Sequence, residues 1–229
     1  MADYESIGTD NGIIYTCNCG WLDRGHSNTK TKRPGIGPKY LWKAILNEQG
    51  IPDTLNRRQA FVLHFRQDAM RKVLGIKFFP GYGKTFVIAK GLSYQQKQEV
   101  ALAIFQEISL KFEESQDSWV ARTLTGTDSG FSEEDLVSNV IGFYSALNPK
   151  IDVNSLCKPV SVKASREVWK SAGAVGKIKN RVFTPRFHAC TECPETPAFP
   201  KEFQRVSPAR KGELFDEWAP PPTLITPFG

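Results

Sequence analysis

The alternation of apolar and polar residues predicts an antiparallel β-sheet in the first half of the chain. Three runs rich in β-branched and aromatic residues, AFVLHFRQ, RKVLGIKFFP and KTFVIAK, follow one another between residues 60 and 90. Their connections are short, and one contains Pro80, Gly81 and Gly83, which is typical of a hairpin turn. We therefore expect a three-stranded meander. Its first strand should direct Phe61, Leu63 and Phe65 to one face and Val62, His64 and Arg66 to the other.

Apolar residues at helical spacing predict two long helices after this sheet. The first covers residues 93–116 and has Ser93 as its N-cap. The second runs from Ser132 to about Leu147, and its S-E-E-D start places Asp135 three residues after Ser132, as in a capping box. We also expect a short strand within residues 12–22 and a helix over residues 39–50. The fold class predicted is α+β, an antiparallel β-meander packed against two long helices. The first long helix should bury Val100, Ala103, Ile104, Ile108 and Phe112.

A change of composition after residue 183 divides the chain. Prolines punctuate the sequence from there to the end, and helical or strand periodicity is weak. We expect a core domain over residues 1–183 and an extended Pro-rich C-terminal arm over residues 184–229. The arm could wrap over the domain or reach a partner. Its apolar anchors for wrapping would be Phe199, Phe203, Phe215, Trp218 and Phe228.

The composition is that of a folded protein without a membrane span. Of the 229 residues, 40% are hydrophobic, which suffices for a sizeable core. No run approaches the roughly 18 apolar residues of a transmembrane helix. The start, MADYESIGTDNG, is acidic and polar, unlike a secretory signal, so we expect a cytoplasmic location. GYGKT does not match a phosphate-binding loop, because Phe78 occupies the position of its first glycine, and we expect no cofactor.

Positive charge is concentrated in one segment. The net charge of +6 is modest, but between Cys157 and His188 eight Lys and Arg residues are opposed by Glu167 alone. Such a segment could bind an anionic ligand or an acidic protein face, or could simply be a solvated surface. Few aromatic residues interleave with the charges, which makes nucleic-acid binding an unfavoured alternative. The candidate contacts are Lys177, Lys179 and Arg181.

The chain has five cysteines, and an odd number cannot all pair within one chain. We therefore expect reduced thiols rather than a disulfide framework. A C-x-C at Cys17 and Cys19 and a C-x-x-C at Cys190 and Cys193 could together supply four thiolates to zinc, or the second pair could be redox-active. The long separation of the two pairs disfavours the metal. We expect less than one zinc per chain and assign no metal ligands.

The segment CNCGWLDRGH gathers three reactive groups, Cys19, Asp23 and His26. A thiolate at Cys19 could perform acyl transfer if His26 accepts its proton. Asp23 and His26 could instead bind a metal or share a proton. The simplest alternative is structural, with Asp23 capping a turn and His26 exposed.

Two helical residues complete the candidate site. Glu107 lies at the edge of the apolar stripe of its helix, where it could act as a base or could pair with Lys111 one turn later. Glu113 lies off the face that Glu107 shares with Lys111. Asn139 is a poor helix former within the second long helix, which indicates a local role in packing or in a pocket.

Three of these motifs, CNCGWLDRGH, IFQEISLKFE and FSEEDLVSNVIG, together resemble an uncharacterised bacterial family, domain of unknown function forty fifty-six. In that family a Cys and a Gly precede Asp-x-x-His, a later helix carries His-Glu, and a Ser-rich turn leads into Asp-Leu-x-Ser-Asn. The resemblance covers about residues 12–147 and implies a shared fold and pocket. Gln106 stands where the family has its His, so a His-Glu pair would be incomplete here.

Two functions therefore remain open, and the sequence does not decide whether the chain is an enzyme. The first is a hydrolase or transferase acting on an acyl or amide bond, or a degenerate relative of one. The alternative is a non-enzymatic binding or assembly protein that uses the basic face and the arm. The reactive residues favour the first, with a catalytic pocket made of Cys19, Asp23, His26, Glu107 and Asn139.

Overall fold

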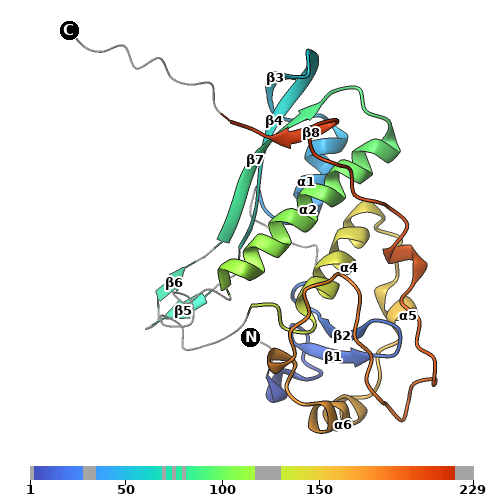
Figure 1. The fold of residues 1–229 in the computed structure, drawn as a ribbon. Helices are drawn as coiled ribbons and strands as arrows, with labels where there is room; N and C mark the ends of the chain where they lie inside the picture. Colours follow the sequence, from blue (N-terminus) through green and yellow to red (C-terminus); the bar gives the residue numbers. More distant parts are fainter. Residues whose placement is uncertain are drawn as a thin grey trace.

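The computed structural model describes residues 3–27, 35–68, 71–73, 76–78, 81–116 and 130–219. Within this part of the chain the α+β class is confirmed, because helices cover one face of an antiparallel sheet (Figure 1). We call this the main sheet. Its strands, in spatial order, are β3 (Ile51–Leu55), β4 (Arg58–Asp68), β7 (Gly81–Ala89) and β8 (Phe215–Glu217).

The prediction that the run after β4 forms the middle strand of the meander is wrong. β4 pairs directly with β7, in an antiparallel ladder that runs from Ala60 opposite Ala89 to Asp68 opposite Gly81. The run between them forms β5 (Arg71–Val73) and β6 (Ile76–Phe78), which pair only with each other. The long ladder places the apolar faces of β4 and β7 side by side, and the antiparallel pair of β5 and β6 forms a separate two-stranded sheet. The predicted faces of β4 hold, since Phe61, Leu63 and Phe65 enter the core and His64 is exposed.

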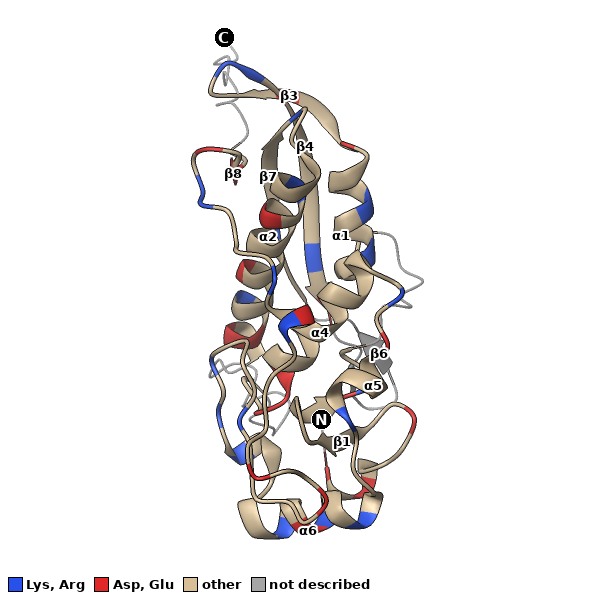
Figure 2. Ribbon diagram, turned by 90° about the vertical axis from the view of Figure 1, so that its right-hand side faces the viewer, with Lys and Arg blue, Asp and Glu red and all other residues tan. Residues whose placement is uncertain are grey.

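Helices α1 (Gly37–Leu46) and α2 (Tyr94–Gln116) lie side by side on the main sheet. Ser93 is the N-cap of α2 as predicted, because its Oγ accepts the N–H of Gln96 at 3.2 Å. Helix α4 (Asp135–Leu147) packs against both α1 and α2 and also against β2. Figure 2 shows an elongated molecule, with the main sheet, α1 and α2 towards one end and α6 at the other.

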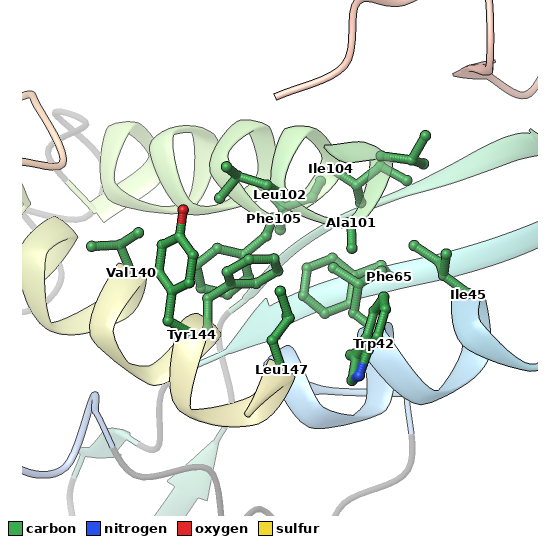
Figure 3. Close-up of a cluster of buried hydrophobic side chains, with 14 of the residues drawn as sticks. Trp42, Ile45, Phe65, Ala101, Leu102, Ile104, Phe105, Val140, Tyr144 and Leu147 are labelled. Carbon is green, nitrogen blue, oxygen red and sulfur yellow. The ribbon is translucent and has the colours of Figure 1, made fainter. Parts of the chain in front are cut away.

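The larger core cluster lies where helices α1, α2 and α4 come together beside the main sheet (Figure 3). Phe105 of α2 and Phe143 of α4 stack with their ring centroids 5.1 Å apart. Burial of each such side chain contributes about 2–3 kcal/mol to folding. These contacts fix α4, whose first turn carries the candidate site. Trp42, Phe65 and Tyr144 belong to the same cluster.

A second cluster lies under the N-terminal hairpin. Residues 12–22 form not one strand but two, because a turn at residues 17–19 reverses the chain. Tyr15 and Trp21 face each other across the pair, with ring centroids 5.4 Å apart. The elements of this region are β1 (Ile13–Thr16), β2 (Gly20–Asp23), α5 (Val153–Cys157), α6 (Val162–Ala172) and the 3₁₀ helices η1 (Tyr4–Ser6) and η2 (Val175–Lys177).

Residues 184–219 run back along the molecule from α6 to the main sheet. Phe203, in the 3₁₀ helix η3 (Lys201–Phe203), and Phe215 in β8 are buried in the larger core cluster. Phe228 of the predicted anchors lies outside the described residues. None of the helices in the described part of the chain is both long and apolar enough to cross a membrane.

Candidate active site

The loop that follows β2 is held by Asp23. Its Oδ1 accepts the backbone N–H groups of Gly25 at 2.6 Å and of His26 at 3.0 Å, so the side chain closes a turn. The backbone N–H of Asp23 donates to Ser138 Oγ of α4 at 2.8 Å. Asp23 therefore caps a turn, as the structural alternative required, and this turn presents His26 to α4.

His26 pairs with the carboxyl group of Asp135, which was not among the predicted site residues. Its Nδ1 lies 3.4 Å from Oδ1 of Asp135, and the His26 side chain is 35% exposed while that of Asp135 is 8% exposed. The other oxygen of Asp135 accepts the N–H of Ser132 at 2.9 Å. The predicted helix start at Ser132 is wrong, because α4 begins at Asp135 with Glu134 as its N-cap. A partly exposed imidazole is thus held by a buried, fixed carboxyl group.

One stripe of α4 faces the loop of residues 23–27. Asp135, Ser138 and Gly142 follow one another at three- and four-residue intervals, and each contacts this loop. A Cβ at Gly142 would lie 3.2 Å from the carbonyl oxygen of His26, so glycine permits the close approach. Asn139 is one turn after Asp135 on the same stripe and is half-buried. Asp23 and His26 are therefore brought together with Asp135, and Asn139 lies one turn further along the same helix.

Buried carboxyl groups lie behind His26. Glu113 of α2 is fully buried, accepts the N–H of Phe131 at 3.2 Å and shares a hydrogen bond with Asp135. Burial raises the pKa of Asp135 well above its ordinary value, and the charge of Glu113 adds to the rise while His26 opposes it. Burial likewise raises the pKa of Glu134, with further contributions from Asp135 and Asp23. Groups with raised pKa values hold protons at higher pH than free carboxyls do.

This arrangement can move protons. His26 offers an imidazole, a side chain that can accept and return a proton, and Asp135 beside it also hydrogen-bonds Glu113. No group of three or more His, Cys, Asp and Glu side chains in the described ranges is arranged to hold a metal ion.

Glu107 does not belong to this cluster, which corrects the prediction. Its two oxygens lie 3.1 Å from Lys84 Nζ and 2.7 Å from Lys211 Nζ. Burial alone would raise the pKa of Glu107, but the hydrogen bonds from Lys211 and Lys84 outweigh it and lower the pKa. Six residues separate Glu107 from Glu113, a rotation of about 240° on a helix, so the two side chains leave α2 on different sides.

A signal for Glu113 was present in the sequence. Ala101, Phe105 and Ser109 are all buried, and they precede Glu113 at four-residue intervals. Residues four apart lie on the same face of a helix, so this series predicts that Glu113 is buried as well. The expected pairing of Glu107 with Lys111 is also absent, since Lys111 Nζ binds Glu114 at 2.6 Å.

Cys19 cannot be the nucleophile in this state, because it forms a disulfide with Cys157 and is fully buried. A second disulfide joins Cys17 to Cys193. The expectation of reduced thiols at Cys17 and Cys19 is therefore wrong. The partners lie 138 and 176 residues away in the sequence, and only the fold brings the paired Cα atoms to 5.1 and 5.2 Å.

The basic candidates lie partly beside the carboxyl cluster. Lys179 Nζ donates to the carbonyl oxygen of Gly130 at 2.7 Å, and the guanidinium of Arg181 lies 4.2 Å from the ring centroid of Phe131. Both residues thus support the backbone that precedes α4. Lys177 is exposed at the end of η2.

A small hollow of about 280 Å³ adjoins the site. Its lining includes Ser27, which follows His26, and Ser145, which lies one turn after Gly142 on α4. Lys39 also lines it and gives the hollow a positive charge. The loop that carries His26 thus borders a hollow that could hold a small part of a ligand.

Comparison with known proteins adds no assignment, because no protein-family model, no curated protein and no solved structure matches the chain.

Proposed function

We propose that the chain is a hydrolase that cleaves an acyl or amide bond, with His26 as the general base and water as the nucleophile. The observation that carries this proposal is the contact of 3.4 Å between His26 Nδ1 and Asp135 Oδ1 at the edge of a buried carboxyl cluster. A transferase would use the same base and replace water by another acceptor. The resemblance to domain of unknown function forty fifty-six stays a proposal, supported by the proximity of Asp23, His26 and Asp135.

The mechanism uses His26 twice. With Nδ1 held by Asp135, the lone pair resides on Nε2, which takes a proton from water as it attacks the carbonyl carbon. The carboxyl group of Asp135, whose Oδ1 lies 3.4 Å from Nδ1, orients the imidazole while it carries the proton. The same nitrogen then returns the proton to the leaving alcohol or amine. The side-chain amide of Asn139 would donate a hydrogen bond to the oxyanion.

Hydrolysis of chromogenic esters and peptide anilides by the full-length protein tests the proposal. We expect His26→Gln and Asp135→Asn each to lower kcat/KM by about 10²–10⁴-fold, the usual contribution of a general base. His64→Gln is the matched control, because His64 is exposed on β4 and its ring contacts Thr85. Equal activity in the His26 and His64 variants, or no hydrolysis by the parent protein, would remove the assignment.

The alternative is a binding or assembly protein, favoured by exposed lysines on and after α6. Lys163, Lys170 and Lys177 lie on a helix and a 3₁₀ turn that follow one another, and Figure 2 marks basic residues along α6. An acidic protein face is the matching partner. Lys177→Glu should then weaken association in a salt-sensitive manner and leave hydrolysis unchanged.

A cytoplasmic location also stays a proposal. The two disulfides argue against it, because structural disulfides persist mainly in oxidising compartments. Counting the free thiols of protein isolated under alkylating conditions would decide between the reducing cytoplasm and an oxidising compartment.

A further inference from the structure

Three of the cysteines line one hollow, away from His26. The hollow has a volume of about 430 Å³, and its walls include Cys17, Cys190 and Cys193. Cys17 and Cys193 are joined by a disulfide, whereas Cys190 is a free thiol that is partly exposed. A thiol and a disulfide that share an open hollow are the reactants of thiol–disulfide exchange.

The backbone places Cys190 within reach of Cys193. The N–H of Cys193 donates to the carbonyl oxygen of Cys190 at 3.2 Å, which closes a turn. Such a turn holds its first and fourth Cα atoms within about 7 Å, near the upper limit of the disulfide range. The C-x-x-C spacing is also the one found in disulfide oxidoreductases. Cys190 therefore needs no large backbone movement to bond to Cys193.

We propose that Cys17, Cys190 and Cys193 form a thiol–disulfide exchange site. The thiolate of Cys190 attacks Sγ of Cys193, the Cys190–Cys193 bond forms, and the Cys17–Cys193 bond breaks. Cys17 leaves with the electron pair and takes up a proton from water. One disulfide and one thiol stand on each side of the reaction, so no external oxidant or reductant is consumed.

Other contacts keep the segment in place while the disulfide changes partner. The N–H of His188 donates to Tyr15 Oη at 2.6 Å, which anchors the segment to β1. His188 Nε2 also lies 2.6 Å from Oε1 of Glu133, a buried residue that precedes α4. The exchange thus frees Cys17 without detaching residues 188–193 from the fold.

Disulfide mapping of the full chain tests the exchange. The oxidised protein is held at about pH 8, where thiolates are appreciably populated, then quenched in acid and alkylated with a maleimide in denaturant. Trypsin releases residues 187–201 as one peptide that contains Cys190 and Cys193. We expect a fraction of this peptide with an internal disulfide and no maleimide, together with an equal fraction of maleimide on Cys17.

Two variants make the result decisive. In Cys17→Ser, Cys190 and Cys193 should close to a disulfide in a glutathione redox buffer and leave no free thiol. In Cys190→Ser, Cys17 should never acquire maleimide. Maleimide on Cys190 alone in the parent protein, or two free thiols in Cys17→Ser, would overturn the proposal. Stoichiometric zinc that protects all three thiols of the reduced protein would also overturn it, in favour of a metal site.

Discussion

His26 and Asp135 join two distant parts of the chain, because the imidazole at the end of the β1–β2 hairpin meets the carboxyl group in the first turn of α4 at 3.4 Å. This relationship depends on how closely the loop of residues 23–27 approaches the helix. The position of the imidazole is therefore sensitive to small changes in α4 that leave both residues in place.

Gly142→Ala tests that sensitivity. The added Cβ would lie 3.2 and 3.3 Å from the carbonyl oxygens of His26 and Ser27, so the loop must move by a few tenths of an ångström. We expect kcat/KM for ester hydrolysis to fall by roughly ten- to a hundred-fold, because displacement of a catalytic group weakens catalysis steeply. Thermal unfolding should change little. Gly176→Ala is the control, since its Cβ would meet only Ser132 Oγ at 3.8 Å; an equal effect there would contradict the expectation.

Glu134→Gln should stabilise the protein increasingly as the pH rises. The pKa of Glu134 is raised above its ordinary value of 4.5, so its stabilising proton is fully present below about pH 4.5 and is lost as the pH rises through the folded-state pKa. Every tenfold increase in the proton affinity of the folded carboxyl group costs the parent protein about 1.4 kcal/mol at high pH, and glutamine removes this cost. Denaturant unfolding of both proteins from pH 4 to pH 8 measures the difference.

Glu114→Gln is the control for this pH series. Glu114 is on the exposed side of α2, with its side chain 48% accessible, so glutamine there should not reproduce the gain in stability at high pH that is expected of Glu134→Gln. A difference between the parent protein and Glu134→Gln that does not depend on pH would mean that Glu134 titrates normally.

Glu107→Gln should reduce stability modestly and leave catalysis intact. The variant loses the ion pairs with Lys84 and Lys211, which are partly exposed, so we expect a loss of about 0.5–1 kcal/mol that shrinks at high salt. The pKa of Glu107 is lowered, so this stabilisation is present above about pH 4.5 and disappears as the pH falls through the folded-state pKa. A loss of hydrolysis as large as that of His26→Gln would show that Glu107 is a catalytic residue after all.

Replacement of both Cys19 and Cys157 by serine should destabilise the fold without abolishing hydrolysis. The disulfide closes a loop with a sequence separation of 138, for which the chain-entropy model predicts about 5 kcal/mol. Chemical denaturation measures the loss. Cys190→Ser is the control, because it leaves both disulfides in place. A folded double variant without any hydrolysis would restore Cys19 as a nucleophile.

The fold was predictable where the periodicity was local. Ser93 and the apolar stripe of α2 define that helix from neighbouring residues, and the alternation at Phe61, Leu63 and Phe65 defines β4. Strand order was not predictable in this way. The residues of β5 and β6 have strand-like composition, yet the partner of β4 is the later strand β7, and local composition does not specify which of two candidate strands pairs with a third.

The candidate site was predictable where a short motif carried its own geometry. Asp23 and His26 lie three residues apart and are joined by a hydrogen bond within one turn. Cys19 was misassigned because its partner, Cys157, is adjacent only in the folded chain. Glu113 was missed because its position was compared with those of Glu107 and Lys111, and not with the buried four-residue series of Ala101, Phe105 and Ser109.

The pairing of β8 with β7 has a consequence for synthesis on the ribosome. Phe86, Val87 and Ile88 offer their outer edge to residues 215–217, which emerge long after β7 has been made. Until then the nascent chain carries an open strand edge, the kind of surface that joins neighbouring chains into aggregates. Synthesis of residues 215–217, rather than the folding of any one helix, is the event that ends this exposure.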